Sequence, residues 1–80
     1  MRRKRTLKQG PIYKEYRIYT SPLMNEHWIS MIVSIGKRRL ITRDSLTDTV
    51  TRVPGEHRSE VGALLATKRY IDEEDAHRHD

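Results

Sequence analysis

Alternation of bulky and polar residues marks two β-strands in the first half of the chain. Residues 12–20 alternate in this way and are rich in β-forming side chains, which predicts the first strand. Residues 27–35 also alternate, and one face of this second strand holds Ile29, Met31, Val33 and Ile35. The other face holds Trp28, Ser30, Ile32 and Ser34. We expect the first of these faces to pack in the core and the second to point away from it.

Two shorter segments complete the predicted sheet. Gly36-Lys37 places glycine first, as a two-residue hairpin turn prefers, and therefore predicts a third strand over residues 38–43. The β-branched residues of segment 47–53 predict a fourth strand. Pro54-Gly55 follows directly, and we expect it to end the sheet.

A change of period after residue 55 predicts a C-terminal helix. The helix stripe recurs at spacings of three and four and comprises Val61, Leu64, Leu65, Lys68 and Ile71. Ser59 is a suitable cap for a helix that begins at Glu60, and a start nearer Glu56 is the alternative. The stripe needs an apolar partner, which the strands supply. We therefore expect an α+β fold: an antiparallel meander of three or four strands with one C-terminal helix packed on one face.

Charge divides the chain into three parts. The 80 residues include 16 Lys and Arg against 11 Asp and Glu, a net charge of +5. Residues 1–8 carry five bases and no acid, whereas residues 72–80 carry five acids. Blocks of like charge repel one another and stay solvated. The sequence therefore predicts a basic flexible arm over residues 1–10, a single domain over 11–72, and an acidic, histidine-containing flexible tail over 73–80.

Length and composition exclude several classes of function. A chain of 80 residues buries only about 60% of its unfolded surface, which leaves no room for a deep cleft between domains. Without cysteine, disulfides and thiol chemistry are excluded. No apolar run approaches the roughly 18 residues of a membrane span, and the basic start Met1-Arg-Arg-Lys-Arg5 lacks the apolar stretch of a secretory signal. We expect a cytoplasmic protein with no membrane partner.

The chain also lacks recognisable catalytic motifs. No serine lies in a nucleophile-elbow context, and His27 and His57 have no partner at a signature spacing. The four glycines are too scattered for a phosphate-binding loop. His77-Arg78-His79-Asp80 has the composition of a weak Zn²⁺ or Ni²⁺ site but no rigid scaffold to fix its geometry. We expect a non-enzymatic protein with no cofactor and no metal site.

Basic residues form two candidate contacts to nucleic acid. The first is the arm, whose cations Arg2, Arg3, Lys4 and Arg5 suit phosphate neutralisation or serve as a solubilising tail. The second surrounds the predicted hairpin and comprises Lys37, Arg38, Arg39 and Arg43. These cations suit phosphate binding, or they protect an edge strand from aggregation. The sequence alone does not place the two groups together.

The sheet face that the helix leaves uncovered is the third candidate. We expect Tyr16 and Ile18 to point inward, which leaves Tyr13, Arg17, Tyr19 and Trp28 on that face. Such a face suits base stacking and phosphate binding, a protein interface, or a small second apolar cluster. Our hypothesis is a binding module for nucleic acid, and the alternative is a module for a protein partner or for self-association as a homodimer.

The order of these residues resembles a loose group of small uncharacterised bacterial and prophage-encoded proteins. The features that carry it are Tyr13-x-x-Tyr16-Arg17-Ile18, Pro22, Trp28 and Arg69-Tyr70-Ile71-Asp72. The resemblance spans about residues 12–72 and implies a sheet with a C-terminal helix, with no assigned activity. The layout also resembles plant AP2 and phage integrase arm-binding domains, which place a sheet in the DNA major groove. The chain lacks the AP2 pattern's Gly-rich strand ends and dense Arg/Trp motif, so a DNA role is implied at the level of the fold alone.

Overall fold

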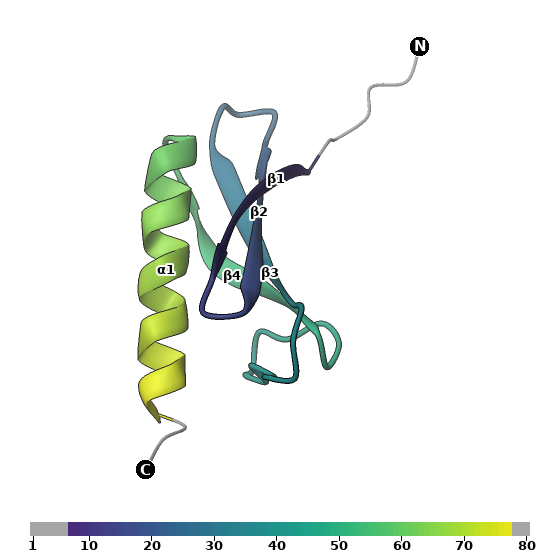
Figure 1. Cartoon of the computed structure of the whole chain (residues 1–80). Helices are drawn as coiled ribbons and strands as arrows, with labels where there is room; N and C mark the ends of the chain where they lie inside the picture. The colour runs from purple at the N-terminus through teal and green to yellow at the C-terminus, as the bar shows by residue number, and fades with distance from the viewer. Residues whose placement is uncertain (1–6, 78–80) are drawn as a thin grey trace.

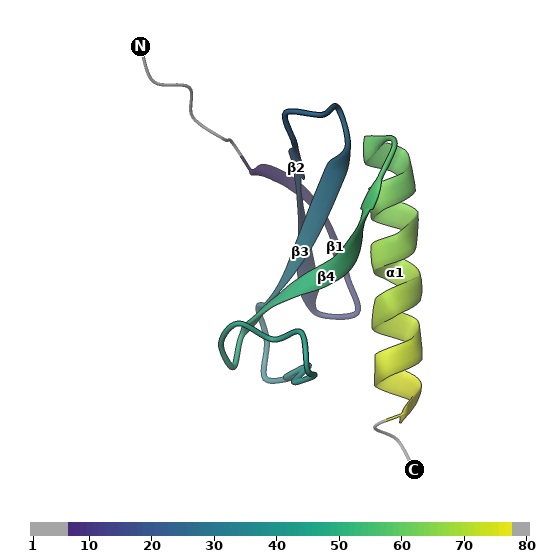
Figure 2. The same ribbon diagram turned by 180° about the vertical axis from the view of Figure 1, so that it is seen from behind.

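Four antiparallel strands and one helix form the fold, in agreement with the predicted α+β meander. The structure, a computed structural model, describes residues 7–77. The elements are β1 (Lys8–Tyr13), β2 (Tyr16–Pro22), β3 (Trp28–Ser34), β4 (Val50–His57) and α1 (Glu60–His77). The strands lie in chain order, and α1 packs against one face of the sheet (Figure 1). Seen from behind, α1 again lies along that face, beside β4 (Figure 2).

The first predicted strand is wrong in its extent, because the segment forms a tight hairpin. Lys14 and Glu15 have φ angles of 51° and 72°, as the two central residues of a type I′ turn require. Tyr13 pairs directly with Tyr16 across this turn. Neither turn residue is the glycine or asparagine that usually signals a hairpin, so alternation alone runs through it. Residues 8–10 of the predicted arm belong to β1, and residues 1–6 lie outside the described part of the chain.

The predicted third strand over residues 38–43 is also wrong, and Gly36-Lys37 does not form a hairpin turn. These residues lie in the loop of residues 35–49, which connects β3 to β4. Leu40 is only 3% exposed and belongs to the core, and its carbonyl accepts hydrogen bonds from the hydroxyls of Ser45 and Thr51, both at 3.2 Å. Burial of Leu40 in the core holds the loop of residues 35–49 against the rest of the fold.

β3 presents to the helix the face opposite to the one predicted. Tyr16 and Ile18 of β2 do point inward, as expected, and Ile18 pairs with Ile32 of β3. Paired residues share a face of the sheet, so Ile32 is buried at 1% exposure and the face of Met31 turns outward. The alternation within β3 is compatible with burial of either face. Its pairing with β2 decides which face is buried.

Small side chains let α1 approach the sheet closely at Ser30. The Ser30 hydroxyl lies 2.5 Å from Oγ1 of Thr67, and Thr67 donates to the Ala63 carbonyl at 2.6 Å. Because the single hydroxyl proton of Thr67 is used there, Ser30 is the donor in their contact. Larger apolar residues form the rest of the core: Tyr16, Ile18, Ile32, Leu40, Val53 and Ile71.

The helix begins at Glu60 with Ser59 as its N-cap, which was one of the two predicted starts. The Ser59 hydroxyl accepts a hydrogen bond from the Gly62 N–H at 3.0 Å. The predicted apolar stripe is partly wrong, since Val61 and Leu65 are 64% and 62% exposed. Ile71 of the predicted stripe is fully buried, and Leu64 packs against the core, as expected. The other fully buried helical positions, Ala63 and Thr67, were not predicted. No helix within residues 7–77 has the length and apolar character that crossing a membrane requires.

The acidic end of α1 stays helical where a flexible tail was predicted. Residues 73–77 belong to the helix, and residues 78–80 lie outside the described part of the chain. Bases from other elements neutralise these acids: Lys14 Nζ lies 2.7 Å from Asp72, and Arg38 Nη1 lies 3.3 Å from Asp75. These contacts offset the unfavourable interaction of carboxylates with the helix C-terminus.

Both edges of the sheet are protected against further pairing. β4 continues through Pro54, which an edge strand tolerates because its outward side needs no N–H. Nearer its start, the Val50 carbonyl accepts the Leu46 N–H at 2.8 Å, and the Arg52 N–H donates to the Asp44 carbonyl at 3.3 Å. The opposite edge, β1, contains Pro11 within an irregularity between Gln9 and Ile12.

Candidate functional site

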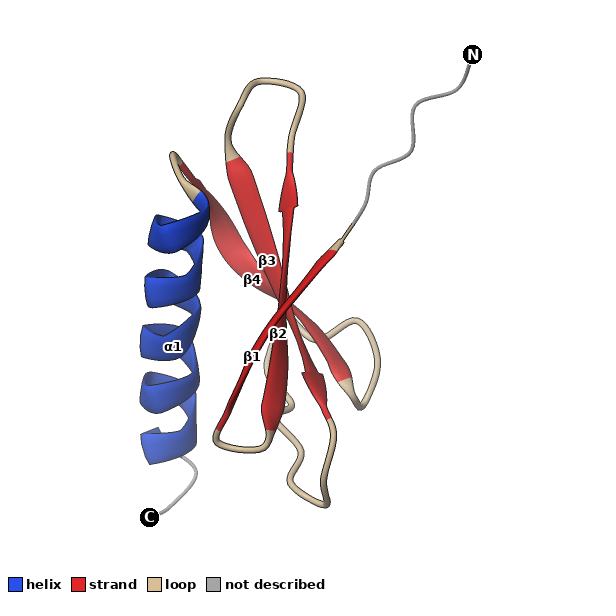
Figure 3. Cartoon of the chain, turned by 45° about the horizontal axis from the view of Figure 1, so that its top comes forward, coloured by secondary structure: helices blue, strands red, loops and turns tan. Residues whose placement is uncertain are grey.

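The sheet face that turns away from α1 carries side chains in three cross-strand rows, and we call it the outer face. The first row, from β1 to β4, is Ile12, Arg17, Val33 and Val50. The second row is Gln9, Tyr19, Met31 and Arg52. The third row is Ser21 and Ile29, on the two central strands. Figure 3 shows α1 on the other side of the four strands.

Most of the outer face is apolar. Ile12 is 51% exposed, and five further large side chains shield one another enough to be half-buried: Tyr19, Ile29, Met31, Val33 and Val50. A folded chain gains by removing such a surface from water, at roughly 25 cal/mol for each Å². Tyrosine, methionine and arginine are also the side chains enriched where proteins meet.

Two arginines give the outer face a positive charge. Arg17 donates from Nη1 to the Gly10 carbonyl at 3.1 Å, so its guanidinium leans from β2 toward β1. Arg52 is exposed on β4. Within residues 7–77 neither arginine forms an ion pair at 4 Å or less.

Two of the three predicted stacking residues lie on the helix side instead of the outer face. Tyr13 donates to both carboxylate oxygens of Asp72, at 2.9 and 3.0 Å. Trp28 pairs with His57 on the buried side, and Lys8 Nζ lies 5.8 Å from the centroid of its ring. The hairpin turn reverses the face of Tyr13, and the β2–β3 register reverses that of Trp28. Of the predicted aromatic set, Tyr19 alone remains on the outer face.

The predicted basic patch is partly used within the loop of residues 35–49. Arg38 contacts Asp75, and Nη1 of Arg39 donates to the Gly36 carbonyl at 2.6 Å. Lys37 and Arg43 are exposed. The other four predicted cations, Arg2, Arg3, Lys4 and Arg5, lie outside the described residues. Among the predicted cations within residues 7–77, Lys37 and Arg43 are therefore exposed, whereas Arg17, Arg38 and Arg39 are half-buried.

No known family, curated protein or solved structure matches this chain. The assignment of a site therefore rests on the geometry of the chain itself. Within residues 7–77, no three histidine or acidic side chains gather as metal ligands.

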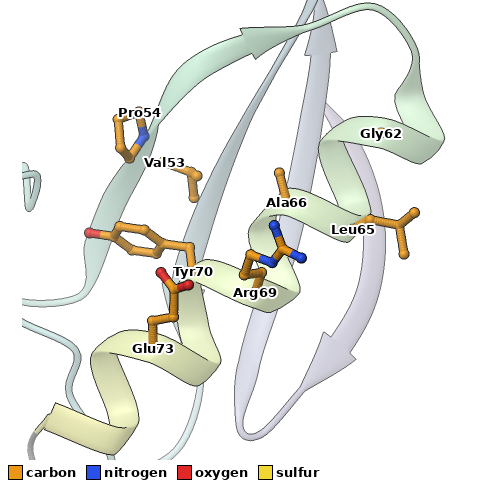
Figure 4. Close-up of a pocket in the computed structure, with 8 residues that line it drawn as sticks. All are labelled: Val53, Pro54, Gly62, Leu65, Ala66, Arg69, Tyr70 and Glu73. Carbon is orange, nitrogen blue, oxygen red and sulfur yellow. The ribbon is translucent and has the colours of Figure 1, made fainter.

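An open groove of about 610 Å³ lies between β4 and α1. Val53 and Pro54 form its strand side, Leu65 its helix side, and Tyr70 and Glu73 lie at one end (Figure 4). The Tyr70 hydroxyl donates to Asp44 at 3.0 Å and contacts Thr42 at 2.7 Å, and burial raises its pKa to about 12. Tyr70 is therefore protonated at neutral pH, and its hydrogen bonds attach the loop of residues 35–49 to the helix.

The tyrosine and lysine of the hairpin turn hold the sheet against α1. Lys14 and Tyr13 both contact the Asp72 carboxylate, and these contacts hold the pKa of Asp72 below its usual range. The same hydrogen bond raises the pKa of Tyr13. These contacts fix the position of β1 and β2, on which Ile12, Arg17 and Tyr19 of the outer face stand.

Sequence reasoning assigned much of the outer face to the core. Ile29, Met31 and Val33 were expected against the helix, and neither Ile12 nor Arg52 was singled out. One signal was present: the face with Ser30 and Ser34 looks polar, yet small hydroxyl residues suit a close helix contact. Alternation cannot reveal this, because the choice of face depends on which residues of β2 pair with β3.

Proposed function

We propose that this chain is a non-enzymatic protein-interaction module that binds another protein surface with its outer face. The observation that supports this is the set of apolar rows on the side of the sheet without a helix, accompanied by Arg17 and Arg52. Antiparallel sheets with one solvated face usually alternate apolar and polar residues. Here β3 is apolar on the solvated face, whereas its buried face holds Ser30 and Ser34 in addition to Trp28 and Ile32.

The outer face is also prepared for binding. Its residues stand on strands, and the strands are held from behind by the Tyr13–Asp72, Lys14–Asp72 and Ser30–Thr67 contacts. A partner that docks on such a surface orders few new backbone segments, which lowers the entropic cost of association. The half-buried state of Tyr19 and Met31 likewise limits the side-chain freedom that binding removes.

Position-specific photo-cross-linking tests this proposal. A benzophenone amino acid replaces Val33 on the outer face, and in a matched variant it replaces Leu65, an exposed apolar residue on α1. Irradiation of cells that produce each variant should give an adduct of defined mass from position 33 and none from position 65. Adding Met31→Lys should remove the adduct, since a charge then lies in the middle of the apolar rows. Equal adducts at both positions, or none at position 33, would contradict the proposal.

Nucleic-acid binding is a second candidate, favoured by the exposure of Lys37 and Arg43 on the loop of residues 35–49. Neither cation forms an ion pair at 4 Å or less within the described residues. The four predicted cations Arg2, Arg3, Lys4 and Arg5 lie outside the described residues and would add positive charge for binding a polyanion. The inward position of Tyr13 and Trp28 weakens the candidate, because it removes two of the three groups on which bases were expected to stack.

A gel-shift titration at several salt concentrations tests the second candidate. If Lys37 and Arg43 contact phosphates, replacing both by alanine should lower the slope of log affinity against log salt by about 2. The matched control replaces Arg58 and Arg69, two exposed arginines outside the loop. It should lower the slope less than the replacement of Lys37 and Arg43 does. Failure to retard either single- or double-stranded nucleic acid at low salt would exclude it.

A further inference from the structure

We infer that the partner of the outer face is a second copy of this chain, packed sheet against sheet; this inference rests on the proposed function. The registers of the four strands set which side chains would meet in such a pair. A two-fold axis parallel to the strands, between β2 and β3, keeps every row at its own height and reverses the order of the strands. β1 then lies over β4 of the second copy, and β2 lies over β3, about 10 Å away.

Two pairs of large apolar side chains then face each other across the sheets. In the first row Ile12 lies over Val50 of the second copy, and each of these contacts occurs twice. In the second row Tyr19 lies over Met31, a pairing of an aromatic ring with a thioether that packs favourably. The third row places Ile29 over Ser21, which is only 2% exposed in the single chain, so this row contributes little contact. The outer face of each copy thereby covers the outer face of the other.

One pair of polar residues is also matched. Gln9 lies opposite Arg52 of the second copy, so its amide oxygen can accept a hydrogen bond from that guanidinium. The two Arg52 side chains stand on outermost strands, about 14 Å apart across the sheets and more in space, beyond the Debye length of about 8 Å. Arg17 lies over Val33, and its hydrogen bond to the Gly10 carbonyl directs its charge away from the axis.

Substitution of Gln9 tests the arrangement without disturbing the fold, because this side chain is exposed in the single chain. Sedimentation equilibrium should show wild-type dimers at concentrations in the micromolar to millimolar range. Gln9→Glu should tighten the dimer about three- to tenfold, since two new ion pairs form with Arg52. Gln9→Lys should weaken it by a similar factor, and Arg52→Glu added to Gln9→Lys should restore it. The matched control, Arg69→Glu on α1, should leave the dissociation constant unchanged.

Cross-linking tests the orientation of the two copies. The chain has no cysteine of its own, so Gln9→Cys and Arg52→Cys each provide one unique thiol. Positions 9 and 52 of different copies are about 10 Å apart in the proposed pair, whereas two copies of either position are about 17 Å apart. A short bismaleimide should therefore join a mixture of the two variants and not either variant alone. Cross-linking of each variant with itself would overturn the arrangement.

Further outcomes separate the two proposals. A chain that stays monomeric up to millimolar concentration overturns the second-copy inference. The proposed function then still predicts an adduct at position 33, with a mass that differs from twice that of the chain. A dimer that ignores Gln9 substitutions and is lost in Leu65→Lys overturns the inference in favour of the groove beside α1. If position 33 also gives no adduct in cells, both proposals fail.

Discussion

Thr67→Val tests the contact between Thr67 and Ser30, which lies on the face of β3 that packs against α1. Thr67 is fully buried, donates to the Ala63 carbonyl at 2.6 Å and accepts from Ser30 at 2.5 Å. Valine keeps the shape of the side chain, so the main change is loss of the hydroxyl. Ser30, 1% exposed, then has a buried donor without its partner. The free energy of unfolding should fall by about 1–3 kcal/mol.

A double-mutant cycle separates this cost from the loss of a single hydrogen bond. Ser30→Ala leaves Thr67 bonded to Ala63 and should cost about 0.5–1.5 kcal/mol. The double variant removes both hydroxyls and leaves no unpaired donor. Its total cost should therefore be smaller than the sum of the single costs by about 0.5 kcal/mol or more.

Urea denaturation followed by the fluorescence of Trp28, the one tryptophan, measures each free energy at a fixed protein concentration. Each 1 kcal/mol should also lower the melting temperature by about 4–8 °C in a domain of this size. Single costs that add without a deficit would show that the two hydroxyls are not coupled. A Thr67→Val variant as stable as the wild type would refute the burial of this face of β3.

Three further predictions concern the core, the helix cap and pH. Ile32→Ala should destabilise the fold by about 2–5 kcal/mol, whereas Val33→Ala on the outer face should cost clearly less; equal costs in urea would contradict the assigned faces. Ser59→Ala should cost about 0.5–2 kcal/mol, measured in the same way, because Gly62 loses the acceptor for its N–H; a neutral result would mean that the cap contributes nothing. Lys14 lowers the pKa of Asp72, so their contribution to stability is present above the unfolded pKa of about 3.9 and is lost as the pH falls through the lower folded value. The stability difference between wild type and Lys14→Met should therefore shrink in acid, and a difference that grows as the pH falls would contradict this linkage.

The elements were more predictable than their pairing. Local signals identified the segments of β2 and β3, the cap at Ser59 and the presence of a C-terminal helix, because alternation, helical spacing and capping are properties of neighbouring residues. They missed the turn at Lys14-Glu15, whose positive φ angles are held within a hairpin that Tyr13 and Lys14 attach to α1. They also missed the core position of Leu40.

The candidate site was less predictable than the fold for the same physical reason. Arg17 and Tyr19 were placed correctly because the inward positions of Tyr16 and Ile18 fixed the faces of β2. The residues of β3 were reversed, because their burial depends on contacts with β2 and α1 that are distant in sequence. A one-residue difference in register changes every side chain of a strand from one face to the other, so a local pattern cannot identify the exposed set.

The protected sheet edges determine how large an assembly this protein can build. Growth of a β-structure into a fibre proceeds by adding strands edge to edge, and here Pro54 and the loop bonds at Val50 and Arg52 obstruct one edge, with Pro11 interrupting the other. Contact through the outer face under two-fold symmetry uses up that surface in both copies. If the proposed pair forms, raising the concentration should increase the fraction of paired chains and leave particle size bounded.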